Sequence, residues 1–139
     1  MNKKLLRIGT NYIPVTDVER ATDWYIHNLG AELSYQDEDK AIINLANQSI
    51  FLVQSDAQQS SNFVDIHGEE WASVTFEVNG LEALEKIHKE FLEKGVRVGE
   101  LEDRGHPGRN FVFYDLDGNK FDVWSELSPV FKEKFMDQT

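Results

Sequence analysis

The sequence predicts an α+β fold built from two β-α-β-β-β modules. Two observations lead to this prediction. Strand-like and helix-like patterns follow one another in the same order in both halves of the chain. The helical pattern of each half also ends at a glycine, Gly30 in the first half and Gly95 in the second.

The first module is predicted at about residues 5–54. Leu5 to Val15 has the pattern of a strand, and Asp17 then begins a helical pattern that ends at Gly30. Three short strands separated by polar turns are expected after the helix, at Glu32–Gln36, Lys40–Leu45 and Ser49–Gln54.

The second module is predicted at about residues 72–127, after a polar connector at 55–71. Its strand, helix and three further strands are expected at Ala72–Val78, Leu81–Lys94, Arg97–Glu100, Asn110–Tyr114 and Lys120–Ser125. With residues 128–139 as a C-terminal tail, the whole chain, 1–139, is expected to form a single domain.

The two halves align on each other without any outside sequence. Val15 and Val78 are separated by the same interval as Val18 and Leu81, so the helices of the two halves match. Two such modules predict two small curved sheets, each with a helix on one face. The open faces must then be covered by each other, by a second chain or by a ligand.

The stretch FVFYDLDGNKFDVW, Phe111 to Trp124, combines a strand, a tight turn and another strand. Strand alternation places Asp122 on the opposite face from Phe121 and Val123. An acidic side chain in that position either meets water or lines a cavity. Asp122 is therefore the first candidate for a functional residue.

The composition excludes several kinds of partner. The chain has 139 residues, a formal net charge of -11 and no cysteine. Binding to nucleic acid or to an anionic membrane needs clustered Lys and Arg, which argues against both partners here. Without cysteine there is no disulfide framework and no thiolate metal site. Because we find neither a membrane-spanning apolar run nor a signal peptide, we expect a cytoplasmic protein.

Two motifs resemble the vicinal oxygen chelate superfamily, which includes glyoxalase I, bleomycin-resistance proteins, fosfomycin-resistance transferases and extradiol dioxygenases. VTDVERATDWYIHNLG, Val15 to Gly30, is similar to the opening motif, and FYDLDGNKFDVW, Phe113 to Trp124, is similar to the closing one. The resemblance covers about Leu5 to Leu127. It implies that the two modules pair into a curved mixed sheet around one cavity. The superfamily hosts isomerases, dioxygenases, thiol transferases and binding proteins, so the resemblance alone implies no single activity.

The resemblance also implies where a metal would bind, with one ligand on each of four equivalent strands. In this chain the four positions fall on Thr10, Phe51, Ser73 and Asp122. A phenylalanine cannot bind a metal, and neutral hydroxyls are poor ligands for a divalent ion that needs several donors. We therefore predict no metal site and no cofactor, and keep a divalent metal only as an alternative.

The predicted ligand-binding residues follow from these positions. Strand alternation turns Tyr12, Thr75 and Trp124 to the same face as the four positions. In the loop RGHPGRN, Arg104 and Arg109 can pair with an anionic ligand group, and Arg109 is preferred because it adjoins a strand. The predicted set is Thr10, Tyr12, Ser73, Thr75, Arg109, Asp122 and Trp124.

The first functional hypothesis is a small-molecule-binding protein of the glyoxalase and bleomycin-resistance type, without a metal. One alternative is a metal-dependent lyase, isomerase or dioxygenase of the same superfamily, in which Asp122 acts with non-standard ligands and His106 moves in from its loop. Another is a protein-interaction module with a closed cavity. A homodimer is expected under all three, because two modules leave sheet edges and open faces to be covered.

Overall fold

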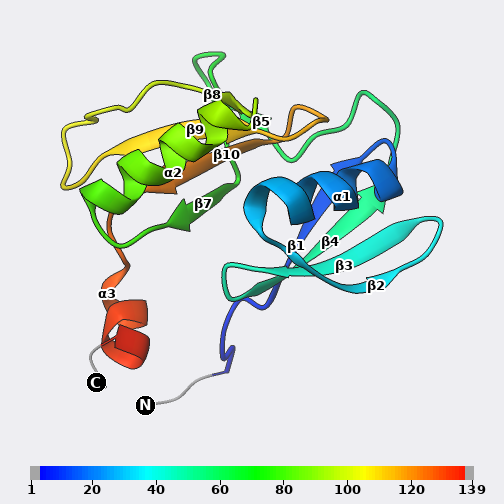
Figure 1. Ribbon diagram of the computed structural model, residues 1–139, viewed down its shortest axis with the longest axis horizontal. Helices are drawn as coiled ribbons and strands as arrows, with labels where there is room; N and C mark the ends of the chain where they lie inside the picture. Colours follow the sequence, from blue (N-terminus) through cyan, green and yellow to red (C-terminus); the bar gives the residue numbers. More distant parts are fainter. Residues whose placement is uncertain (1–3, 137–139) are drawn as a thin grey trace. The chain divides into compact units, whose positions relative to one another are not determined.

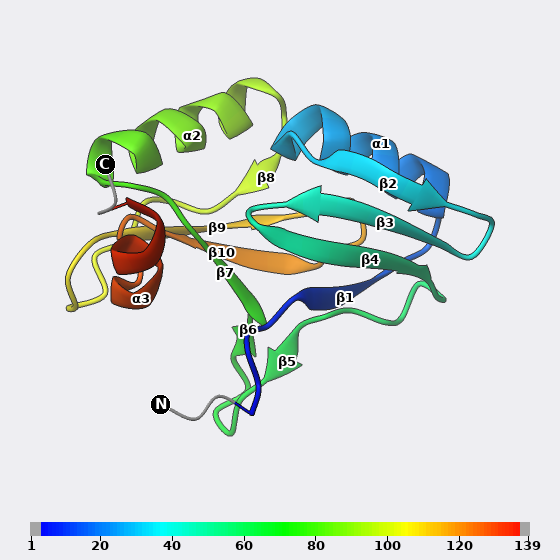
Figure 2. The same cartoon turned by 90° about the horizontal axis from the view of Figure 1, so that it is seen from below.

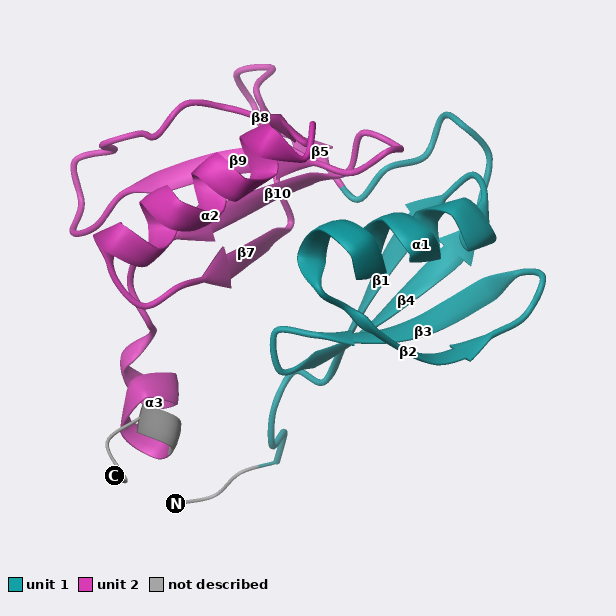
Figure 3. Cartoon of the chain, viewed as in Figure 1, with its two compact units in different colours: residues 1–61 teal, residues 62–139 magenta. Residues whose placement is uncertain are grey.

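The structure, a computed structural model, describes residues 4–136, and side chains as far as residue 134. The chain divides into two compact units, residues 1–61 and 62–139 (Figure 3). Each unit contains a four-stranded sheet. The boundary between the units lies inside the predicted connector, 55–71.

Unit 1 has the predicted order of one strand, one helix and three strands (Figure 1). Its elements are β1 (Thr10–Val15), α1 (Val18–Leu29), β2 (Glu32–Gln36), β3 (Lys40–Leu45) and β4 (Gln48–Gln54). The strands lie in the order β1-β4-β3-β2, which can be followed in Figure 2. β1 is parallel to β4, whereas the other neighbours are antiparallel, so the sheet is mixed.

The core of unit 1 lies between α1 and one face of this sheet. In β1, β3 and β4 strand alternation buries residues on one face, and α1 covers that face. The buried side chains are Ile13, Val15, Ala41, Ile43, Ile50 and Leu52 from the strands, with Val18, Ala21 and Tyr25 from α1. The opposite face carries Tyr12 and Phe51, whose ring centroids are 5.2 Å apart. Tyr12 is 66% exposed, so α1 covers only one side of the sheet.

The prediction of a strand from Leu5 is wrong at its start, because β1 begins at Thr10. The only neighbour of β1 in the sheet is β4, which begins at Gln48 after a turn with positive φ at Ala46 and Asn47. The Gly9 carbonyl still accepts the backbone N–H of Ser49. Within residues 4–9, no residue pairs in a strand.

Unit 2 repeats the order and the topology of unit 1. Its main elements are β7 (Val74–Glu77), α2 (Leu81–Glu93), β8 (Arg97–Val98), β9 (Asn110–Tyr114) and β10 (Lys120–Trp124). The strand order is β7-β10-β9-β8, with β7 parallel to β10 and the other pairs antiparallel. The α+β class and the two β-α-β-β-β modules are therefore confirmed. The single cavity shared by the modules stays a prediction.

β7 and β8 are shorter than predicted. β7 begins at Val74 because this residue is the first one that pairs with β10, opposite Phe121. β8 ends at Val98, although Gly99 still donates its backbone N–H to the Val112 carbonyl. The chain between Gly99 and Asn110 leaves the sheet, and this loop contributes to the site described below.

The core of unit 2 is aromatic. The Phe113 ring is 5.0 Å from Phe91 of α2, 5.2 Å from Phe121 and 6.0 Å from Phe76. Phe111 packs edge-on against Phe91 as well. Because these rings fill the face of the sheet that α2 covers, the alternate residues of β9 and β10 point to the open face.

A short hairpin in the connector was not predicted. β5 (Phe63–Val64) pairs with β6 (Glu70–Trp71), and Asp65 organises the loop between them. Asn62 ties the hairpin to the sheet, because its side chain bonds the Gly118 carbonyl and the backbone N–H of Lys120.

The predicted tail begins with a helical segment. α3 (Pro129–Phe131) continues into a π-helical turn, η1 (Lys132–Met136), and residues 137–139 lie outside the described part of the chain. Within residues 4–136, none of the helices combines the length and the apolar character that crossing a bilayer requires.

Candidate functional site

Asp122 lies in the middle of β10 on the open face of the unit 2 sheet. Its neighbours Phe121 and Val123 are buried on the opposite face, as the alternation predicts. The side chain of Asp122 is only 13% exposed. A carboxylate this close to full burial needs partners for its charge.

The structure supplies three partners for the Asp122 carboxylate. Asn110 donates from Nδ2 to Oδ2 over 2.9 Å, and Thr75 donates from Oγ1 to the same oxygen over 3.3 Å. Arg104 donates from Nη2 to Oδ1 over 3.0 Å. Both carboxylate oxygens are therefore engaged. Asp122 is the centre of a small network rather than an isolated acid.

Arg104 joins Asp122 to a second carboxylate. Its Nε and Nη2 donate to the two oxygens of Glu102, over 3.3 and 3.1 Å. Partial burial of the guanidinium acts to lower its pKa, but the hydrogen bonds to Glu102 and the charge of Asp122 outweigh burial and raise the pKa above its usual range. The guanidinium is therefore a permanent cation held between two anions.

A pocket of about 310 Å³ opens beside this network. Among the residues that line it are Trp71, Thr75, Glu102, Arg104, Val112 and Asp122. Trp71, which is 50% exposed, supplies an aromatic wall, and its Nε1 donates to Asp65 Oδ2 over 2.7 Å. The pocket thus combines one aromatic face with a few fixed polar groups, as small-molecule sites often do.

The loop that carries Arg104 is fastened to the end of β10. Trp124 donates from Nε1 to the Pro107 carbonyl over 3.0 Å, and the backbone N–H of Arg109 donates to Ser125 Oγ over 2.8 Å. Gly108 has a φ of 81°, and a Cβ there would lie 2.7 Å from Ser125 Oγ. The loop therefore lies against the strand, where it holds Arg104 at the pocket.

The structure brings together only part of the predicted ligand-binding set. Thr75 and Asp122 are bonded to each other and line the pocket. Trp124 lies on the same strand but holds the loop. The guanidinium of Arg109 lies 3.5 Å from Asp103 rather than at Asp122, and Ser73 precedes β7. The remaining predicted residues, Thr10 and Tyr12, belong to β1 of unit 1.

Asn110, Arg104 and Trp71 are among the site residues that the predicted set did not include. Asn110 could have been found, because the antiparallel pairing of β9 and β10 makes it a diagonal neighbour of Asp122 on one face. Arg104 was ranked below Arg109 because Arg109 adjoins a strand in the sequence. The path of the loop, however, places the guanidinium of Arg104 at Asp122. Trp71 carried no signal, because the connector showed no strand pattern.

Two histidines of unit 2, His106 and His88, make their contacts with groups other than Asp122. His106 packs edge-on against Trp124, with its Nδ1 2.9 Å from the Pro107 carbonyl oxygen. His88 lies on α2 with Nε2 2.8 Å from the Gly99 carbonyl oxygen. Among the residues that the structure describes, no group of three or more His, Cys, Asp or Glu side chains could hold a metal ion.

The residues at the four positions implied for a metal do not fit one. Asp122 offers a carboxylate, but its oxygens already accept bonds from an arginine, an amide and a hydroxyl. Phe51 lies at the equivalent place in unit 1, because it pairs with Tyr12 in β1 as Asp122 pairs with Thr75 in β7. The phenyl ring of Phe51 has no atom that could bind a metal ion. The two equivalent positions, Phe51 and Asp122, therefore supply a single carboxylate.

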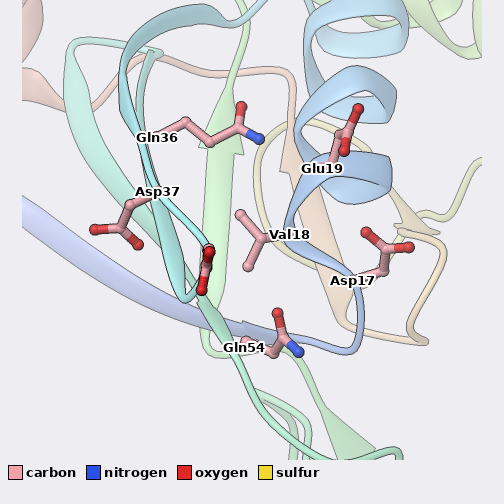
Figure 4. A pocket seen from close by; sticks show the side chains of 7 residues that line it. Asp17, Val18, Glu19, Gln36, Asp37 and Gln54 are labelled. Carbon is pink, nitrogen blue, oxygen red and sulfur yellow. The ribbon is translucent and has the colours of Figure 1, made fainter.

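Unit 1 contains a second pocket, of about 490 Å³ (Figure 4). Its wall is rich in acidic side chains, but two of these already have structural roles. Asp17 accepts a bond from the backbone N–H of Arg20 and so caps α1. Asp37 binds Lys40 Nζ over 2.9 Å and Tyr35 through its hydroxyl over 2.8 Å. We therefore place the candidate functional site in unit 2.

Comparison with known sequences gives the family. The profile of the Glyoxalase/Bleomycin resistance protein/Dioxygenase superfamily matches residues 5–123. The chain belongs to this superfamily. A search of curated proteins finds no sequence that matches it.

Solved structures show the same fold at low sequence identity. Lactoylglutathione lyase from Agrobacterium tumefaciens matches with a TM-score of 0.69 and 16% identity, over 88% of this chain and 95% of that chain. The fosfomycin resistance protein FosX from Listeria monocytogenes matches with a TM-score of 0.69 and 19% identity, over 91% and 96%. A mutant of FosX in complex with Mn(II) and 1S,2S-dihydroxypropylphosphonic acid has a TM-score of 0.68 and 18% identity, over 97% and 99%. At these identities the likeness establishes the fold, and relatives with this fold bind small ligands.

Proposed function

We propose that this protein binds a small organic molecule, without a metal ion, in the unit 2 pocket at Asp122 and Arg104. The observation that carries the proposal is the ion pair between these residues at the wall of the pocket. It provides a fixed charged group at the pocket wall, and the carboxylate of Asp122 is already paired with a cation. No bond-making step is part of the proposal.

The contacts with the ligand follow from the pocket walls. The exposed face of Trp71 offers a stacking surface, and its bond to Asp65 holds the ring in place before a ligand arrives. The Thr75 hydroxyl and the Arg104 guanidinium offer hydrogen bonds. Thr10, Tyr12, Ser73, Arg109 and Trp124 stay predicted contacts that the unit 2 pocket does not include.

Relatives support the choice of a small ligand. A mutant of the Listeria protein was crystallised with a phosphonic acid and Mn(II), and the Agrobacterium protein is named for lactoylglutathione. We carry over from them only the class of ligand, a small molecule. The predicted homodimer and the cytoplasmic location also stay proposals.

A thermal-shift screen tests this function. The panel holds small aromatic, cationic and thiol compounds, together with lactoylglutathione and 1S,2S-dihydroxypropylphosphonic acid, each measured in EDTA. We expect at least one compound to raise the melting temperature of the wild type. Trp71→Ala should abolish that shift. Leu116→Ala, which removes an exposed apolar side chain outside the pocket, should retain it.

The other two hypotheses are distinguishable in the same screen. A compound that binds only after a divalent metal replaces EDTA would favour the metal-dependent enzyme. A silent screen in both buffers would contradict the proposed function and favour the interaction module.

A further inference from the structure

We propose that Arg104 takes the place of a divalent metal ion at Asp122 and that its guanidinium keeps such an ion out of the site. The inference deepens the proposed function, because it explains how the pocket operates without a metal. The inference concerns the ion pair between Arg104 and Asp122, and its test requires no organic ligand.

The first argument is the position of one nitrogen atom. Arg104 Nη2 lies 3.0 Å from Asp122 Oδ1 and 3.1 Å from Glu102 Oε2. Two carboxylates from different segments of the chain therefore converge on a single cationic atom. Convergence of carboxylate oxygens on one point is also how proteins bind Mg²⁺, Mn²⁺ and Ca²⁺. A divalent ion at this point would overlap the guanidinium and be repelled by its charge.

The second argument is the direction of the other hydrogen bonds at Asp122. Asn110 Nδ2 and Thr75 Oγ1 both donate to Oδ2, so the lone pairs on that oxygen face hydrogen atoms. Oδ1 accepts from Arg104. The carboxylate thus has hydrogen-bond donors on both oxygens, where a metal ion would otherwise bind.

The third argument is that oxygen ligands are present once the arginine is removed. Without Arg104, the carboxylates of Glu102 and Asp122 would lie near each other with no cation between them. An all-oxygen set of this kind suits a hard divalent cation.

The loop makes the arginine a fixed part of the site. Asp103 Oδ1 accepts the backbone N–H of Gly105 over 3.1 Å, directly after Arg104. Farther along, Trp124 and Ser125 hold the loop through Pro107 and the backbone N–H of Arg109. A long side chain that is anchored in this way loses little further freedom when it pairs with two carboxylates.

The test measures Mn(II) binding by isothermal titration and by the electron paramagnetic resonance signal of free Mn(II). Wild-type protein should show no saturable binding at Asp122. Arg104→Gln should bind one Mn(II) per chain, with an affinity at least about tenfold above the detection limit that the wild type does not reach, and its melting temperature should rise with Mn(II). Arg104→Lys keeps a cation and should show no gain. The double variant Arg104→Gln with Asp122→Asn should lose the gain.

Two results would overturn the inference. One is saturable Mn(II) binding to the wild type that Asp122→Asn removes. The other is the absence of any gain in Arg104→Gln, or in Arg104→Met if the glutamine variant does not fold. The ligand screen tests the proposed function separately. If the wild type bound no organic compound, the proposed function would be contradicted, but the comparison of Mn(II) binding between wild type and variants would still hold.

Discussion

At the scale of single residues, the chemistry of Asp122 is set by its partners. The same carboxylate, exposed and unpaired, would be an ordinary surface acid. Held by Thr75, Asn110 and Arg104, it becomes the anchor of a cation beside a pocket. An aspartate at position 122 should therefore matter for the stability of the protein as well as for the proposed ligand binding.

Substitution of Asp122 should destabilise the protein. Asp122→Ala leaves the amide of Asn110 without its acceptor and removes one of the two anionic partners of Arg104. We expect a loss of about 1 to 3 kcal/mol in the free energy of unfolding, measured by urea denaturation. As a matched control, Glu90→Ala removes an exposed ion pair with Lys94 and should cost no more than about 0.5 kcal/mol. Equal effects of the two substitutions would contradict the network described here.

The ionisation of the Asp37 carboxyl group leads to a prediction about how stability depends on pH. Its hydrogen bonds from Lys40 Nζ, the backbone N–H of Asp39 and the Tyr35 hydroxyl hold its pKa well below the usual range. Because the folded-state pKa is the lower one, this stabilisation is present above the unfolded pKa and is lost as the pH falls through the folded pKa. In a ¹³C NMR titration, Asp37 should stay ionised at a pH where ordinary aspartates protonate. Lys40→Gln should move its midpoint upward, and an ordinary midpoint in the wild type would show that the interaction is absent.

At the scale of elements, the loop between β8 and β9 carries the site. Its attachment to β10 depends on the close approach of Gly108 to Trp124, Ser125 and Glu126, where a Cβ would meet atoms at 2.7 to 2.8 Å. Rigid strands thus determine where Arg104 lies, although the residue itself is in a loop.

Two glycines of this loop separate backbone strain from steric fit. Gly105 and Gly108 both have positive φ, but a Cβ at Gly105 meets nothing within 4 Å. Gly105→Ala should therefore cost only the strain of its backbone, about 1 to 2 kcal/mol. Gly108→Ala should lower the melting temperature further and weaken the ligand-induced shift, because the loop must move away from β10. Calorimetry that gives the same melting temperature for both variants would contradict this account of the loop.

How far each element could be predicted depends on whether its signal is local. The strands on either side of the turn at Asp115 to Asn119 were predicted well, because alternation and turn-forming residues agree there. The start of β1 was wrong, since an apolar run does not reveal where its partner strand begins. The β5-β6 hairpin was missed in a polar connector. The ion pair to Arg104 depends on the path of a loop, which no periodic pattern contains.

At the scale of the whole molecule, the repeat keeps the topology and changes the chemistry. At the equivalent place in the two sheets, unit 1 has the pair Tyr12 and Phe51, and unit 2 has the pair Thr75 and Asp122. The aromatic pair offers stacking surface, whereas the polar pair anchors a charge. Membership of the superfamily accounts for the shared architecture, and these particular residues account for a site that we propose to be metal-free.

The most direct test of this claim is an NMR titration of the wild type in EDTA with the compound that gives the largest thermal shift. The chain has three tryptophans, and their indole N–H signals report on different places. Trp71 lines the pocket, Trp124 is bonded to the loop, and Trp24 packs on Tyr25 in unit 1. We predict that the Trp71 and Arg104 Nε signals shift in EDTA while the Trp24 signal stays in place. Shifts that appear only after Mn(II) is added, or that occur at Trp24 and not at Trp71, would contradict a metal-free site at Asp122 and Arg104.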